Sequence, residues 1–247
     1  MTPERFKRIT DMLAQRQLDL TVCMEEVHKP HNLAAIVRTA DAIGIHRVHA
    51  VWPKSWIHKR KGTARGSQNW VDVKLHPDID SAVAELKAAG MQILATHLSE
   101  SSVDFRAIDY TKPTAILVGQ EKHGIGEEAL ALADHHIVIP MVGMVQSLNV
   151  SVAAAAILYE AQRQRELAGC YQRGCPLDLE EQNSILFEGG YPIYAQLCKE
   201  KEMPYPQLGP AGEILADEAW WQQMQLTRKG WAAQQSDDTS EEYIDEA

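Results

Sequence analysis

Short apolar runs alternate with amphipathic segments through the first 168 residues, and this alternation constrains the fold more than any other feature. Each apolar run is nearly unbroken, which is typical of strands buried on both faces of a parallel sheet. We expect strands at 20–24, 47–52, 70–73, 91–95, 115–118 and 137–139. We expect helices at 3–16, 32–43, 79–89, 127–133 and 150–168. The pattern predicts an α/β fold, a parallel sheet flanked by helices.

The character of the chain changes at both ends. We expect residues 1–18 to form an N-terminal helical extension and residues 19–168 to form the α/β domain. Beyond Gly169, Pro and Gly punctuate short helical segments. We therefore expect 169–235 to be a C-terminal helical extension packed on the α/β body, not a second domain. Residues 236–247 hold six acidic residues and no basic one, which predicts a disordered tail.

The formal net charge of −10 at first argues against a nucleic-acid partner. The acidic tail supplies −6 of that charge, which leaves −4 for residues 1–235, where basic residues gather locally. Local patches decide phosphate binding. The candidate RNA contacts are Arg5, Arg8, Arg16, Lys59, Arg60, Lys61, Arg163, Arg165 and Arg173. A solvated helix face is the alternative for the arginines of 5–16 and of 163–173.

Metal, membrane and secretion signals are weak. The four cysteines form no CxxC pair, and no second Cys/His pair completes a zinc site, so we expect no metal and reduced thiols. Residues 135–159 lack charged Asp, Glu, Lys and Arg, but Pro140 and Gly143 interrupt them, so a strand, a loop and a buried helix fit better than a membrane span. The N-terminus has no apolar signal core. We expect a soluble, cytoplasmic protein without a membrane partner.

Two loops resemble nucleotide-binding turns only in part. The dinucleotide fingerprint GxGxxG is absent after the first strand, which disfavours a nicotinamide-dependent enzyme. Gly119 and Gly124 have the spacing of a phosphate loop, but Ile125 and Gly126 stand where Lys and Ser/Thr would handle phosphate and magnesium. The sequence therefore disfavours a nucleotide hydrolase.

Three segments in order carry a more specific signal: Asn-Leu-Ala-Ala-Ile-Val-Arg at 32–38, Leu-Val-Gly-Gln-Glu-Lys-His-Gly-Ile at 117–125, and Ile-Pro-Met-Val-Gly-Met-Val-Gln-Ser-Leu-Asn-Val-Ser at 139–151. Together they resemble the SpoU branch of the SPOUT methyltransferases. Each motif alone is weak, whereas all three in this order are specific. The flanks look like the subfamily that methylates the 2′-hydroxyl of guanosine 18 in tRNA. The resemblance covers about residues 1–225 and leaves out the acidic tail.

The resemblance implies a deep trefoil knot in the C-terminal half of the sheet. It also implies a homodimer whose sites are completed across the interface, and S-adenosylmethionine as the cofactor. Glycines allow close backbone approach, and small or apolar side chains can wall an adenine. The loops implied to hold the cofactor carry Thr96, Gly119, Ile139, Met144 and Leu148.

The resemblance places the catalytic arginine at Arg38. An arginine is not readily deprotonated, so we favour a role in which Arg38 binds the hydroxyl or a phosphate and stabilises developing negative charge, over a role as general base. His31 is the alternative base or a phosphate contact. Without the other motifs, Arg38 would be interpreted as an ordinary surface charge.

The remaining site residues are implied to position these groups. Asn32 and Glu121 would orient Arg38 or the ribose, and Ser147 and Asn149 would shape the cofactor loop. Helix capping alone would also explain Asn32 and Asn149, and a turn near a helix start would explain Glu121.

The implied function is methyl transfer to the ribose of guanosine 18 in the D-loop of tRNA. One alternative is the same reaction on ribosomal RNA, although enzymes of that kind typically carry a separate N-terminal RNA-binding domain and only a short helix precedes the first strand here. A second alternative is a catalytically silent RNA-binding protein. The presence of Asn32, Arg38, Glu121, Ser147 and Asn149 argues against that alternative.

Overall fold

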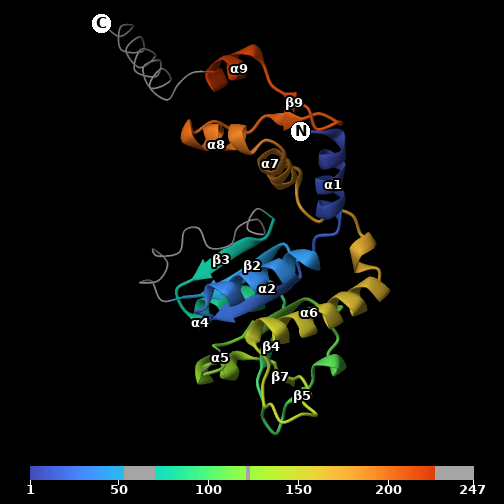
Figure 1. Ribbon diagram of the computed structural model, residues 1–247, viewed down its shortest axis with the longest axis vertical. Coiled ribbons are helices and arrows are strands. Elements are labelled where there is room, and N and C mark those ends of the chain that lie inside the picture. The colour runs from blue at the N-terminus through green and yellow to red at the C-terminus, as the bar shows by residue number, and fades with distance from the viewer. Residues whose placement is uncertain (53–69, 121–122, 226–247) are drawn as a thin grey trace, which may run out of the picture. The chain divides into compact units, whose positions relative to one another are not determined.

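The computed structural model describes residues 1–52, 70–120 and 123–225, and it divides into two compact units (Figure 1). The sheet unit comprises Ala14–Pro176, and the terminal unit combines Met1–Leu13 with Leu177–Ala247. The two ends of the chain, which we expected to form two separate helical extensions packed on the α/β body, thus cluster with each other in one unit. The predicted tail at 236–247 lies outside the described residues.

A seven-stranded sheet forms the centre of the sheet unit, and every neighbouring pair of its strands is parallel. The strand order is β3-β2-β1-β6-β4-β7-β5. The bounds are β1 Leu20–Glu25, β2 Arg47–Val51, β3 Asp72–His76, β4 Gln92–Thr96, β5 Val103–Asp104, β6 Thr114–Val118 and β7 His135–Val138. The predicted parallel α/β architecture is confirmed. β5 was not predicted, because a strand of two residues gives no periodic signal in the sequence.

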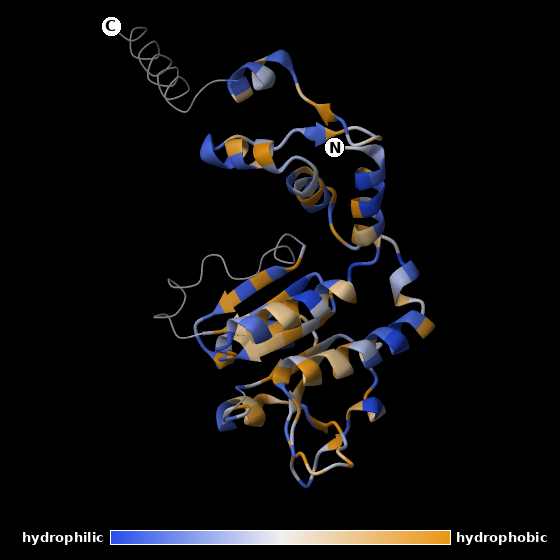
Figure 2. Ribbon diagram, viewed as in Figure 1, coloured by the Kyte–Doolittle hydropathy of each residue, from blue (hydrophilic) through white to orange (hydrophobic). Residues whose placement is uncertain are grey.

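Helices cover both faces of this sheet (Figure 1). One face packs against α2 (Pro30–Ala42) and α6 (Val150–Leu167), and the other packs against α4 (Ile79–Ala88) and α5 (Glu127–Leu132). Figure 2 shows why: the central strands are coloured mostly toward the hydrophobic end of the scale, whereas the helices are mixed. Ile36 and Ile157 are fully buried, and each such side chain stabilises the fold by roughly 1.5–3 kcal/mol.

The uncharged stretch 135–159 ends within α6, which begins only at Val150. In the described part of the chain, no helix combines the length and apolarity that a membrane crossing would require. Asn149 caps this helix at its start, and α6 packs against α2. The strand order is consistent with the implied knot, whose threading stays a prediction.

The terminal unit has its own small core. It contains α7 (Leu179–Gly190), α8 (Pro192–Glu200), the two-stranded pair of β8 (Gln207–Leu208) and β9 (Ile214–Leu215), α9 (Glu218–Gln225), and all but the last residue of α1 (Pro3–Ala14). Phe187 is fully buried and lies 4.8 Å from Tyr205 and 6.5 Å from Trp220, measured between ring centroids. Aromatic packing of this kind can stabilise a small unit that has few aliphatic side chains.

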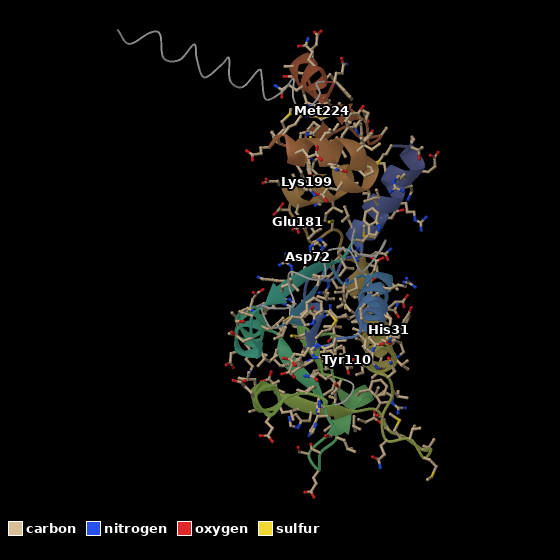
Figure 3. All side chains as sticks on the ribbon, turned by 60° about the vertical axis from the view of Figure 1, so that its left-hand side comes forward. His31, Asp72, Tyr110, Glu181, Lys199 and Met224 are labelled. Carbon is tan, nitrogen blue, oxygen red and sulfur yellow. The ribbon has the colours of Figure 1, made fainter. Side chains whose placement is uncertain are left out.

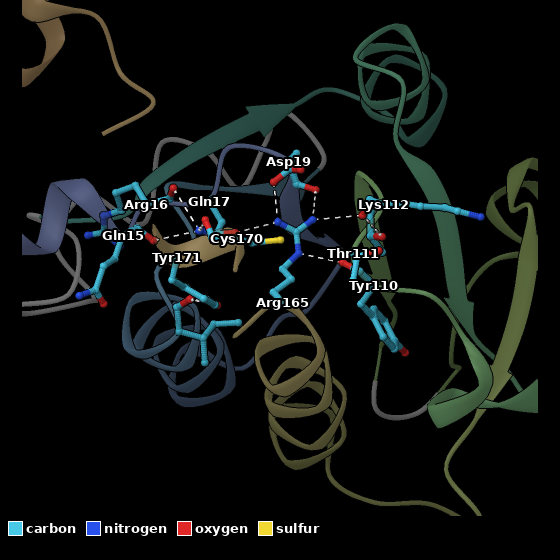
Figure 4. A network of polar contacts seen from close by, with 12 residues as sticks. Gln15, Arg16, Gln17, Asp19, Tyr110, Thr111, Lys112, Arg165, Cys170 and Tyr171 are labelled. Atoms are coloured by element: carbon cyan, nitrogen blue, oxygen red, sulfur yellow. Dashed lines mark hydrogen bonds and ion pairs between the residues drawn. The ribbon is translucent and has the colours of Figure 1, made fainter. Parts of the chain in front are cut away.

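Arg165, in the last turn of α6, is fully buried and hydrogen-bonded (Figure 4). Its Nε donates to the Tyr110 carbonyl at 2.8 Å, and Nη1 donates to Gln17 Oε1 at 2.9 Å and to Asp19 Oδ1 at 2.5 Å. Nη2 donates to the Asp19 and Lys112 carbonyls at 3.0 and 3.1 Å. The guanidinium thus joins α6 to the start of β1 and to the segment before β6. Its predicted role as an RNA contact is wrong, because no donor faces solvent.

Arg16 is buried in the same way. Its Nη1 donates to the Ile45 carbonyl at 2.9 Å, and Nη2 donates to Asp41 Oδ1 at 2.9 Å and to the Trp70 carbonyl at 2.6 Å. Burial lowers the pKa of this guanidinium, while Asp41 acts in the opposite direction. The prediction that Arg16 contacts RNA is also wrong, because its guanidinium is buried and hydrogen-bonded inside the sheet unit.

Two buried histidines face each other on β2 and β3. His49 Nδ1 lies 2.8 Å from His76 Nε2, and the rings are nearly parallel, so an N–H of one donates to the other. Glu85 completes a group, among the described residues, whose atoms lie within 4.8 Å of one another and could hold a metal ion. Each member already has a protein partner, since Glu85 pairs with Lys74 at 2.6 Å. Burial, followed by the neighbouring His76, lowers the pKa of His49 to about 4.

Replacing Arg165 with Met should lower the free energy of unfolding by about 3 kcal/mol or more, because buried acceptors lose their charged donor. Urea denaturation followed by circular dichroism would measure this change. The matched control is Arg163→Met, two residues earlier, since Arg163 is exposed and pairs only with Glu160 on the same helix among the described residues. The control should lose much less stability, because an exposed ion pair contributes little. Equal losses in the two variants would contradict the structural role of Arg165.

The stability of the protein should fall as the pH drops from about 6.5 to 4. An unfolded histidine has a pKa of about 6.5, so between these values the unfolded state binds a proton that folded His49 does not. The contribution of neutral His49 to the free energy of unfolding is fully present above pH 6.5. About 2–3 kcal/mol of that free energy should be lost on reaching pH 4. Urea denaturation of the wild type and of His49→Gln at several pH values would measure it. An identical pH dependence in both proteins would contradict the assignment.

Candidate functional site

The predicted site residues follow neighbouring strands of the sheet at the edge where the strands end. β1, β6, β4 and β7 are adjacent and parallel, so the loops that follow them start along one edge. In open α/β sheets this edge is where ligands bind. Gly119 follows β6, Thr96 ends β4, and Ile139 follows β7. The α2 helix, which carries Arg38, follows β1 after a connection of four residues.

Two different faces of α2 carry the predicted residues. His31 and Arg38 are both exposed, and residues seven apart on an α-helix lie on the same side. Figure 3 labels His31 on this helix. Asn32, by contrast, is buried. Within this chain, Asn32 and Arg38 therefore point away from each other, and His31 is the predicted residue that shares the side of Arg38.

Asn149 has two tasks at the start of α6. Its Oδ1 accepts from the backbone N–H of Ser151 at 2.9 Å and from Ser151 Oγ at 2.6 Å, which caps the helix. Its Nδ2 donates to Asn32 Oδ1 at 3.3 Å. The capping interpretation of Asn149 is thus correct and incomplete. Asn32 is not a cap: it lies in the first turn of α2, and Lys29 occupies the capping position.

The glycine turn (Gly119, Gln120 and residues 123–126) is tightly folded. The backbones of Gln120 and Gly124 exchange two hydrogen bonds, each of 2.9 Å. A Cβ at position 119 would lie 2.2 Å from the Gly124 carbonyl oxygen, so only glycine fits there. Gly124 itself has φ of +70°, a conformation that favours glycine. Glu121 was predicted to act in this turn, and it lies outside the described residues.

Two carboxylates beside this turn were not predicted from the sequence. Glu25, the last residue of β1, accepts from the backbone N–H of Gly126 at 2.8 Å. Glu26 accepts from Gln120 Nε2. Burial raises the pKa of Glu25, which is opposed by its bond to Gly126. Two adjacent acidic residues directly after a buried strand were the available signal.

The other predicted cofactor residues differ in exposure. Thr96 is half-buried, and its Oγ1 donates to the Leu117 carbonyl at 3.1 Å. Ile139 is half-buried against the core. Leu148 is 36% exposed and Met144 is 99% exposed, so this apolar loop is not covered by the described part of the chain. Ser147 is exposed in the same loop.

The cationic candidates separate into three groups. Arg8 and Arg173 are exposed and have no hydrogen bond or ion pair to other described residues. Arg5 donates twice to the Gly189 carbonyl at the end of α7, at 2.9 and 2.6 Å, and Arg163 makes a two-bond pair with Glu160. Both side chains are exposed, and the carboxylate of Glu160 partly neutralises the charge of Arg163. Lys59, Arg60 and Lys61 lie outside the described residues.

The chain is similar in sequence to known proteins of one family. The model of the SpoU rRNA Methylase family matches residues 19–159, and that of the SpoU rRNA methylase C-terminal region matches 163–217. A tRNA (guanosine(18)-2′-O)-methyltransferase of Escherichia coli (strain K12) is 63% identical over 226 residues, which are 91% of this chain and 99% of the relative.

Two solved structures are similar as well. The TrmH/SpoU tRNA modifying enzyme of Aquifex aeolicus matches with a TM-score of 0.69 and 45% identity, covering 76% of this chain and 96% of that one. The SpoU methyltransferase AviRb of Streptomyces viridochromogenes, in complex with the cofactor AdoMet, matches with a TM-score of 0.52 and 30% identity, covering 62% and 59%. The family models together span most of the described chain, and the chain belongs to the SpoU rRNA methylase family.

Proposed function

We propose that the chain transfers a methyl group from S-adenosylmethionine to the ribose 2′-hydroxyl of guanosine 18 in tRNA. The observation that carries this proposal is the 63% identity to an enzyme of that name over 91% of the chain. The geometry agrees with this proposal. The glycine turn and the apolar loop before α6 follow strands that end at one edge of the sheet, and the helix that carries the exposed Arg38 follows another strand of the same edge. A substrate of this kind leads us to expect the protein in the cytoplasm.

The residues present suit an S-adenosylmethionine site. Because Gly119 has no side chain, a ligand can approach its backbone closely. Half-buried Ile139 and exposed Leu148 offer apolar surface for an adenine. Thr96 and Met144 would contribute backbone groups from their loops. When bound, the cofactor would supply an electrophilic methyl group on a sulfonium, from which a neutral thioether is a good leaving group. The protein must mainly align the ribose oxygen and manage one proton.

Arg38 would act on the ribose. Its exposed guanidinium is a fixed cation that can hydrogen-bond the 2′-oxygen or the adjacent phosphate and stabilise the charge that develops there. We prefer this to a role as base, because arginine holds its proton too strongly. His31 lies on the same side of α2, where an imidazole can accept the proton of the hydroxyl. Asn32, Glu121, Ser147 and Asn149 would shape the surrounding loops.

We infer that the protein acts as a homodimer. The loop after β7 and the adjoining part of α6 expose Val142, Met144, Val145 and Val152, with exposed fractions from 51% to 106%. Clustered apolar side chains of this kind mark an interaction surface. A second copy of the chain on this surface would cover it and complete the cofactor loop. Exposed Arg8 and Arg173 are the described cations that we expect to contact phosphates.

Nucleoside mapping of tRNA from a deletion strain would test the substrate. We expect 2′-O-methylguanosine at position 18 to disappear and to return when the gene is restored. The purified protein should also methylate a tRNA transcript with labelled cofactor. Loss of a ribose methyl group from ribosomal RNA, with position 18 of tRNA unchanged, would replace tRNA by ribosomal RNA as the substrate.

Replacing Arg38 with Ala should reduce methyl transfer by about 100-fold or more, because the developing charge loses its preorganised partner. Binding of S-adenosylmethionine, measured by calorimetry, should change little. Arg106→Ala is a suitable control, since Arg106 is also exposed and bonds only Asp104 among the described residues. Full activity of Arg38→Ala would refute the assigned role.

A further inference from the structure

Two consecutive carboxylates at the end of β1 reach the two ends of the glycine turn. Glu26 accepts from Gln120 Nε2 near the start of the turn, and Glu25 accepts from the Gly126 N–H at its end, at 2.8 Å. Successive residues of a strand normally point to opposite faces. Both side chains can therefore reach the same turn only if the backbone departs from the strand conformation at this point.

The backbone of Glu26 provides that change. Its φ is +51°, in the left-handed region that residues other than glycine rarely adopt because it is sterically strained. The backbone is fixed there by its N–H, which donates to the Val51 carbonyl at 3.0 Å. A strained residue is retained where surrounding contacts over-determine it, and such residues cluster at functional sites.

The turn also has contacts of its own that define its internal shape. That shape already follows from the paired backbone bonds of Gln120 and Gly124 and from the contact that only glycine permits at 119. What Glu25 and Glu26 fix is the position of the turn relative to β1. The α2 helix, with Arg38, starts at Pro30, four residues after Glu26. These contacts therefore connect the proposed cofactor turn to the helix that carries the proposed catalytic arginine.

We propose that Glu26, supported by Glu25, is a positioning residue that acts through Gln120 to align the glycine turn with α2. This inference rests on the proposed methyl transfer and deepens it. Alignment matters because a displacement of about 1 Å between reacting groups can cost about 100-fold in rate. His28 Nε2 lies 3.7 Å from the same Glu26 carboxylate.

The test compares Glu26→Gly with Glu26→Gln. Glycine removes the carboxylate and also accepts the positive φ without strain, so the thermal midpoint should stay the same or rise. Methyl transfer to tRNA should nevertheless fall by about 10-fold or more, through kcat, through the KM for S-adenosylmethionine, or through both. Gln keeps an oxygen that can accept from Gln120 Nε2, and it should restore activity to within about threefold of the wild type.

Two further variants sharpen the comparison. Gln120→Ala should lose as much activity as Glu26→Gly, and the double variant should lose no more than either, because both remove one interaction. Glu127→Gln is the control, an exposed acidic residue next to the turn whose side chain bonds no described residue of it. It should keep wild-type rates. Wild-type rates in Glu26→Gly, or losses that multiply in the double variant, would overturn the positioning role.

Calorimetric titration with S-adenosylmethionine separates this inference from the proposed substrate. If the wild type binds the cofactor but leaves tRNA unmethylated, the substrate proposal fails, and weaker cofactor binding by Glu26→Gly than by Glu26→Gln still supports the positioning role. Equal affinities of the two variants in that case would overturn it. A wild-type protein that binds no cofactor would overturn both proposals.

Discussion

Backbone hydrogen bonds pair β1 with β6 in parallel, from Leu20 opposite Thr114 to Met24 opposite Val118. This register places the residues after Met24 beside the residues after Val118, and it thereby brings Glu25 and Glu26 to Gly119 and Gln120. A slip of one residue would turn every side chain of the strand to the opposite face. The candidate site depends on this pairing, because its turn and its helix belong to two separate segments of the chain.

Buried arginines hold the elements that carry the site. Arg165 fixes the end of α6 to the segments that enter β1 and β6, and Arg16 fixes the segment before β1 to the loops around β2 and β3. At the other end of α6, Asn149 joins the helix start to Asn32 on α2. α6 is thus anchored at its start by a neutral amide pair and at its end by a buried cation.

Much of the fold could be predicted from the sequence because its signals are local. An apolar run such as 115–118 needs no distant residue to indicate a buried strand, and the observed β6 differs from it by one residue. Asn149 likewise caps its helix through Ser151, two positions away. The division into two units could not be predicted, because it depends on Arg5 and the other residues of α1 meeting residues such as Gly189, 184 positions later.

The sequence by itself determined the strand–helix alternation, the edge of the sheet on which the motifs lie, and the membership in a methyltransferase family, since these depend on periodicity and on residues adjacent in the chain. Only the tertiary structure decided which charges are available. Arg16 and Arg165 look like RNA contacts in the sequence and are buried by partners up to 148 positions away. Glu25 and Glu26 were not predicted to have a role, and their carboxylates hold a turn about 100 positions later. The physical reason is that a charge takes its role from its burial and its partners, and the fold alone brings those together.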